Sequence, residues 1–177
     1  MYSLETKRAI MNTVAAIRSP SNYRSQAFRY VLLGGFIAGL DDTIYPTVKT
    51  LMAGKPWFSP WKGVASGLLG KAAGEGGMEI VALGLALHYF ICISAAALLY
   101  LLVSRVKFVP RQWIVLGVLY GIAFLLTMNY VIVPLSAIGR SIYPPEILHI
   151  QAFWHIVLVG LPTAFFVTRA LKQAPPN

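Results

Sequence analysis

Three stretches of this chain are apolar over about the 20 residues that a helix needs to cross the hydrocarbon core of a membrane. They lie at residues 80–103, 112–135 and 148–167. Lipid offers the backbone no hydrogen-bond partners, so a crossing segment of this kind must be helical. The composition agrees, because 57% of the 177 residues are hydrophobic and only 12% are charged, about half the charged fraction of soluble domains. The sequence therefore predicts an all-α integral membrane protein.

A fourth segment, residues 28–52, is less regular. Its apolar run ends before Asp41 and Asp42, and apolar residues then recur from Ile44 to Met52. A short re-entrant or interfacial segment is the alternative to a full crossing. We expect a crossing, because an odd number of spans would place the basic segments on opposite sides of the membrane. The prediction is a bundle of four transmembrane helices over residues 28–172, followed by a tail at 173–177.

Lysine and arginine positions predict the orientation of these spans. One side would carry ten bases, from the N-terminal arm, the connection between the second and third spans and the C-terminal tail. The other side would carry Lys55, Lys62, Lys71 and Arg140. Both termini are therefore expected in the cytoplasm. The net charge of +9 is mainly a topology signal, so no nucleic-acid partner is expected.

The N-terminal arm, residues 1–27, lacks the continuous apolar stretch and cleavage site of a signal peptide. Apolar residues recur in it at near-helical spacing, at Leu4, Ile10, Val14 and Ile17. With Lys7 and Arg8 on other faces, the pattern predicts an amphipathic helix on an anionic cytoplasmic leaflet. A mitochondrial presequence is the alternative interpretation.

Glycines recur every three or four residues after the first span and inside the spans. Ser59 and Pro60 are typical of a helix start, and they predict a short interfacial helix at residues 60–76. Its glycine face would press against another helix; a flexible glycine-rich loop is the alternative. Glycine pairs within the spans predict close packing, with helices of this chain or of another subunit. The predicted packing residues are Gly35, Gly39, Gly63, Gly67, Gly70, Gly74, Gly117 and Gly121.

Prolines interrupt three of the four predicted spans, at Pro46, Pro134 and Pro162. Each removes a backbone donor and frees the carbonyl four residues earlier, so a kink is expected at each. The carbonyl that Pro46 frees belongs to Asp42.

Ionisable side chains within a membrane are costly and usually face the bundle interior or water. A rise of about 1.5 Å per residue places five polar side chains in the outer half of the predicted spans. They are Asp41, Asp42, His88, Asn129 and His155. Below we call these five residues the polar cluster.

Three roles are open for the polar cluster. It would hold the bundle together through hydrogen bonds, exchange protons or ions with the outer side, or hold one b-type haem between His88 and His155. The single cysteine, Cys92, excludes an internal disulfide and a multi-cysteine metal centre. No cofactor is expected, and no metal site other than the haem alternative. Because the sequence carries no hydrolase triad and no phosphate-binding glycine motif, no catalytic residue and no enzyme activity are expected.

Four stretches of the chain resemble the YagU-like group of small bacterial inner-membrane proteins. They read GGFIAGL, LHYFICISAAALLY, VLGVLYGIAFLL and FWHIVLVG. The resemblance covers residues 28–171 and includes His88 and His155, although the proline–proline–arginine run after the first span is missing. It implies four helices in a bacterial cytoplasmic membrane and a connection with acid stress, with no known reaction.

The functional expectation is a non-enzymatic accessory or structural subunit. Its partners would be the lipid bilayer and either other membrane subunits, with respiratory or photosynthetic complexes as plausible hosts, or further copies of itself. A proton- or ion-handling protein that uses the polar cluster is the first alternative, and a redox carrier with one haem is the second.

Overall fold

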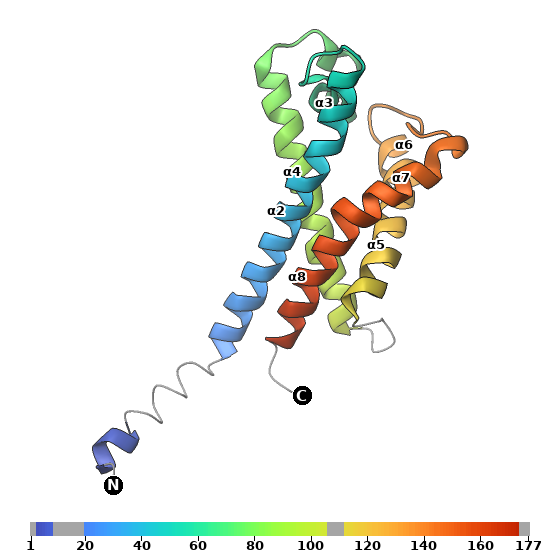
Figure 1. The fold of residues 1–177 in the computed structure, drawn as a ribbon. Helices are drawn as coiled ribbons and strands as arrows, with labels where there is room; N and C mark the ends of the chain where they lie inside the picture. Colours follow the sequence, from blue (N-terminus) through green and yellow to red (C-terminus); the bar gives the residue numbers. More distant parts are fainter. Residues whose placement is uncertain (1–2, 9–19, 106–111, 174–177) are drawn as a thin grey trace.

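The computed structural model describes residues 3–8, 20–105 and 112–173, and all its regular elements there are helical. Residues 4–8 are helical, while the rest of the predicted amphipathic arm helix, residues 9–19, lies outside the described residues. In chain order the elements that follow are α2 (Pro20–Met52), α3 (Ser59–Leu69), the 3₁₀ helix η1 (Gly70–Gly74), α4 (Met78–Arg105), α5 (Trp113–Thr127), the π-helical η2 (Met128–Ile132), α6 (Val133–Leu135), the 3₁₀ helix η3 (Pro145–Ile147), α7 (Leu148–Trp154), the π-helical η4 (His155–Gly160) and α8 (Leu161–Lys172) (Figure 1).

Three continuous helical segments are long and apolar enough to cross a membrane. They run over Met78–Arg105, Trp113–Leu135 and Pro145–Lys172. This confirms the prediction of an all-α chain with apolar helices of membrane-spanning length. Helix α2, with 33 residues, is long enough but not among them. Its polar interruption at Asp41 and Asp42, followed by Lys49, lowers its apolar character.

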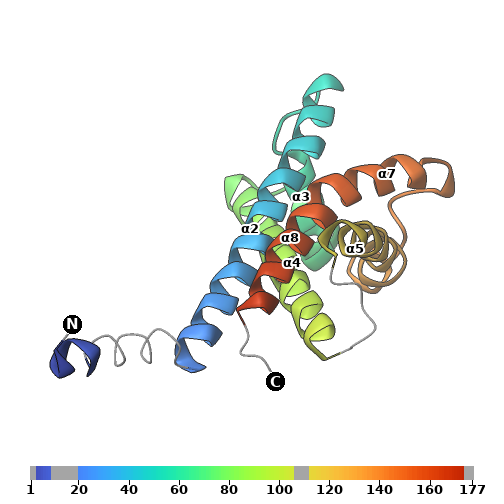
Figure 2. The same cartoon turned by 60° about the horizontal axis from the view of Figure 1, so that its bottom comes forward.

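Helix α8 occupies the centre of the bundle and contacts α2, α4 and α5. Figure 2 shows α8 between α2 and α5. The start of α2 and the end of α8 lie at one end of the bundle, while α3 and the connection at residues 136–144 lie at the other (Figure 1). We call the latter the α3 end. An apolar core of α4, α5 and α8 residues, Leu99, Val103, Leu116, Ala164 and Val167, fills the bundle near the opposite end.

Glycines allow the helices to approach one another closely. A Cβ atom at Gly35 would lie 2.6 Å from the Cα atom of Ile93 in α4, and one at Gly121 would lie 2.6 Å from the Cα atom of Ile156 in η4. Gly39 meets the ring of Tyr89 in the same way. Further close approaches occur at Gly34, Gly84, Gly117 and Gly160. The glycine faces within the long helices are therefore filled by helices of this same chain.

The glycines of α3 and η1 behave differently from the expectation. A Cβ atom at Gly63 or Gly74 would meet nothing within 4 Å, and one at Gly67 or Gly70 only atoms 3.8 Å or more away. The reason is that α3 packs on α4 through its opposite face, where Trp61 and Ala65 are buried. The glycine face is left open, apart from light contact with Ser136 and Ala137.

Two of the three prolines lie two residues after the end of a π-helical turn. Pro134 comes after η2 and Pro162 after η4. Because proline cannot donate to the carbonyl four residues earlier, the backbone bonding pattern is shifted locally, and a π turn is one way to shift it. Asn129 and His155 lie in these two turns. Pro46, in contrast, is contained in an uninterrupted α2.

Candidate functional site

His88 connects α4 to α2. Its side chain is buried, and its Nε2 atom lies 2.9 Å from the carbonyl oxygen of Gly39. Because a carbonyl only accepts, this nitrogen carries the proton and donates it. The missing side chain at Gly39 brings the two helices close enough for the bond. The Trp61 ring packs edge-on against the imidazole at a centroid distance of 5.4 Å, and the tryptophan itself is buried.

His155 lies in η4, and its side chain is also buried. Its Nδ1 atom is 2.8 Å from the carbonyl oxygen of Gln151, one turn earlier, and donates to it. The imidazole faces the rings of Phe124 and Tyr143, at centroid distances of 6.1 and 6.4 Å. Both cluster histidines therefore donate to backbone carbonyl groups of their own bundle.

Asn129 fixes the connection between α6 and α7. Its side chain is 1% exposed, and its Oδ1 atom accepts from the amides of Ile142, at 3.2 Å, and Tyr143, at 2.9 Å. Its Nδ2 atom donates to the carbonyl oxygen of Tyr143 at 3.1 Å. One amide side chain thus satisfies three backbone groups of a segment without regular structure.

The two aspartates lie on α2, and both side chains are half-buried. The pKa of the Tyr143 phenol is raised to about 12, first by burial and then by the negative charges of Asp42 and Tyr45. Asp42 is therefore close enough to Tyr143 for its charge to act on the phenol. Tyr45 in turn stacks on Trp154 of α7, with ring centroids 4.7 Å apart. Asn129 and His155 therefore both lie against Tyr143, and the charge of Asp42 acts on its phenol, while His88 lies against α2 at Gly39.

The raised pKa of Tyr143 predicts a loss of stability in alkali. The ordinary phenol pKa is 10.0, so the phenol is neutral in both the folded and unfolded protein at lower pH. Between pH 10 and about 12 only the unfolded protein ionises, and the free energy of unfolding falls. Tyr143→Phe removes this ionisable phenol, so the variant should lose less stability than the wild type over this pH range. Thermal unfolding from pH 8 to 11.5 measures the difference; parallel curves would contradict the assignment.

Sequence reasoning missed several buried polar groups outside the cluster. Gln151 is 2% exposed, one helical turn before His155, and that spacing is the signal that could have identified it. The hydroxyl groups of Thr47, Tyr120 and Thr163 are buried without a hydrogen-bond partner among the described residues. These groups make the bundle interior more polar than the five cluster residues alone would indicate.

The geometry does not fit a haem between the two histidines. The Nε2 atom of His88, a usual axial ligand atom, donates to Gly39, and Trp61 covers the ring. Over residues 3–8, 20–105 and 112–173, no group of three or more His, Cys, Asp or Glu side chains could hold a metal ion. The three bonded side chains serve the backbone instead: His88 joins α4 to α2, Asn129 joins η2 to the connection that follows α6, and His155 bonds within its own helical segment.

Comparison of the chain with protein-family models, with curated proteins and with solved structures found no match.

Proposed function

We propose that this chain is a non-enzymatic membrane protein with four spans that serves as a structural or accessory subunit of a larger assembly or of a homo-oligomer. The observation that carries the proposal is the bonding of the polar cluster: His88, Asn129 and His155 are each bonded to backbone groups of their own chain. Side chains used in this way stabilise a scaffold. The membrane proposed is the bacterial cytoplasmic one, in line with the YagU-like resemblance.

The proposal counts α2 as the fourth span. Large apolar side chains lie exposed along one stripe of α2, spaced three or four residues apart, at Leu33, Phe36, Leu40, Ile44, Val48 and Leu51. Such a stripe suits a helix that faces lipid or another apolar helix. Helix α2 also packs along α4 and along α8, which belong to two of the helical segments long and apolar enough to cross.

Four spans place the start of α2 and the end of α8 in the cytoplasm and the α3 end outside. On a Cys92→Ser background, Lys55→Cys should react with a membrane-impermeant maleimide in intact cells. Ser25→Cys, exposed near the start of α2, should react only after the membrane is permeabilised. If Ser25→Cys and Lys55→Cys both react in intact cells, α2 does not cross.

A partner helix has a suitable surface on α2. A groove of about 480 Å³ is lined by Arg29, Leu32, Leu33 and Phe36 of α2 and by Ile93 of α4. It adjoins the exposed stripe, and the glycine faces inside the bundle are already occupied by this chain's own helices. Purification in a mild detergent should therefore recover the chain with a defined partner or as an oligomer. Leu33→Ala with Phe36→Ala should release that partner, whereas Leu98→Ala with Leu102→Ala, exposed on α4, should not. A wild-type protein that is always a lone monomer would contradict the proposal.

A second candidate function is proton or ion handling from the outer side. It is favoured by the half-buried Asp41 and Asp42 and by the buried hydroxyl groups of Tyr120 and Thr163, which have no hydrogen-bond partner among the described residues. Liposomes that contain the wild type should then show an ion or proton flux that Asp42→Asn abolishes. Equal flux in the two proteins would exclude a role for this carboxylate.

A further inference from the structure

A pocket of about 460 Å³ opens at the α3 end, outside the polar cluster. One wall is the glycine face of α3 and η1, and the other is the connection that follows α6. The lining residues are Lys62, Gly63, Ser66, Gly70, Lys71, Gly74, Ala137, Ile138 and Arg140. Three of them are basic and none is acidic, so the pocket is positively charged.

The gathering of bases at this pocket is selective. Between the end of α2 and the start of α4, and again between α6 and α7, the chain has four bases. Three of these line the pocket, and only Lys55 lies elsewhere. Few lysines and arginines are expected on the outer side of such a bundle, so their concentration at one place points to a ligand of opposite charge.

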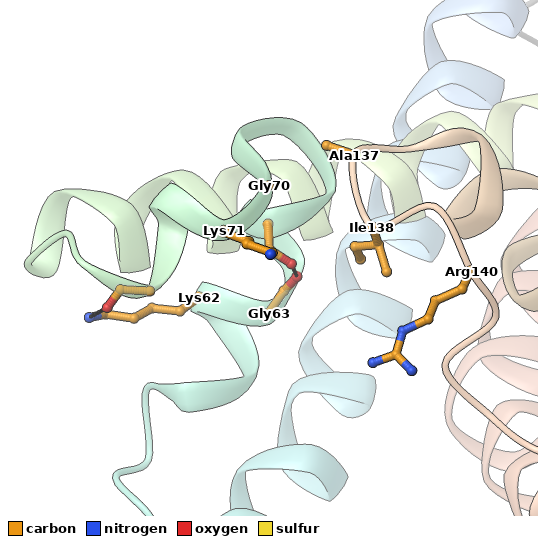
Figure 3. A pocket seen from close by; sticks show the side chains of 9 residues that line it. Lys62, Gly63, Gly70, Lys71, Ala137, Ile138 and Arg140 are labelled. Carbon is orange, nitrogen blue, oxygen red and sulfur yellow. Dashed lines mark hydrogen bonds between the residues drawn. The ribbon is translucent and has the colours of Figure 1, made fainter.

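The three bases have different roles in the pocket. The ammonium group of Lys62 donates to the carbonyl oxygens of Gly76, at 2.5 Å, and Gly74, at 3.3 Å, and so holds the η1 segment in place. Lys71 and Arg140 are exposed and come from opposite walls. Figure 3 shows them on either side of the gap, with Lys62 turned the other way. Lys71 and Arg140 are therefore the two side chains free to contact a ligand.

The walls are fixed relative to each other. The amide of Ala137 donates to the carbonyl oxygen of Gly67 at 2.9 Å, which ties the connection to α3. Gly70 and Gly139 have φ angles of 61° and 72°, a backbone conformation that residues other than glycine rarely adopt. With no side chain at Gly63 or Gly74, the space between the walls stays open.

We infer that this pocket binds a phosphate-bearing anion between Lys71 and Arg140. The planar guanidinium of Arg140 suits two phosphate oxygens at once, and the ammonium of Lys71 supplies a second positive charge from the facing wall. The phosphate belongs either to an anionic phospholipid of the outer leaflet or to a small phosphate compound outside the membrane. The inference shares only the orientation of the bundle with the proposed function, and it does not depend on a partner subunit.

The test uses the full-length protein purified in mild detergent, with phosphatidylglycerol and inorganic phosphate added separately. Native mass spectrometry measures retained lipid, and the shift in unfolding temperature measures binding of either probe. Lys71→Gln and Arg140→Gln should each weaken binding about tenfold. Lys55→Gln is the matched control, with the same loss of charge outside the pocket. Gly63→Leu fills the pocket without meeting protein atoms at Cβ, so it should block binding while the unfolding temperature without ligand is kept.

Each outcome decides the inference. Retention of phosphatidylglycerol that depends on Lys71, Arg140 and Gly63, without an effect of inorganic phosphate, assigns the site to a lipid headgroup. A stabilisation by inorganic phosphate with the same dependence assigns it to a small compound. If neither probe binds, or if Lys55→Gln weakens binding as much as Arg140→Gln, the pocket is not a phosphate site. These binding measurements do not depend on a partner subunit, so a lone monomer in the purification experiment would contradict the proposed function without changing them.

Discussion

Gly121→Val is expected to lower the free energy of unfolding by more than about 3 kcal/mol, beyond the usual cost of an overpacked core. The new Cβ atom would lie 2.6 Å from the Cα atom of Ile156 and 2.9 Å from the carbonyl oxygen of His155. These are backbone atoms, so no side-chain rotation relieves the clash. Helices α5 and η4 must separate, and His155 then loses its position beside Phe124 and Tyr143.

Unfolding of the purified protein by a denaturing detergent, followed by tryptophan fluorescence, measures this loss. Gly63→Val is the matched control, because Gly63 is also helical and a Cβ atom there meets nothing within 4 Å. The change in helix propensity from glycine to valine is shared by both variants and cancels in the comparison. Equal stability of the two variants would show that α5 and η4 do not approach each other as described.

Asn129→Leu is expected to cost about 3 kcal/mol, because three part-buried hydrogen bonds, each worth about 1 kcal/mol, are lost. Leucine has a similar volume, so the effect does not come from a cavity. The amides of Ile142 and Tyr143 lose their acceptor, and the carbonyl oxygen of Tyr143 loses its donor. The connection between α6 and α7 should become free to move.

Hydrogen exchange separates this local effect from a general loss of stability. In Asn129→Leu the amides of Ile142 and Tyr143 should exchange much faster, while those at the centre of α4 change only by the global difference. Tyr130→Leu is the control, because Tyr130 lies in the same π turn with its side chain about half exposed. Unchanged protection at Tyr143 in Asn129→Leu would contradict the bonding described.

The long helices could be predicted from the sequence because lipid imposes a length and an apolar composition that no other fold needs. Close packing at Gly35 and Gly121 followed from the same reasoning, since small residues are what bring membrane helices together. The glycine face of α3 could not be assigned in this way. Spacing shows that four glycines share a face, but not that Trp61 on the opposite side would be the one to pack on α4.

The hydrogen-bond partners of the polar cluster could not be predicted from the sequence either. Depth along each span placed His88 and His155 in one half of the bundle, and the structure locates both in its interior. Their acceptors, however, are the backbone carbonyls of Gly39 and Gln151, and a backbone group has no sequence signature. The same holds for Asn129, whose partners lie in a connection without periodic pattern. Prolines marked where helices change geometry, but not that a π turn would form there.

The central place of α8 has a consequence for biosynthesis. Helix α5 packs mainly on η4 and α8, and α2 has its most extensive packing on α8, yet α8 is the last of these helices to leave the ribosome. Until it enters the bilayer, α2 with α4 forms one unit and α5 is a nearly separate one. A message that stops before codon 145 would therefore yield a product that is inserted but never assembled, and the cell's membrane proteases should degrade it.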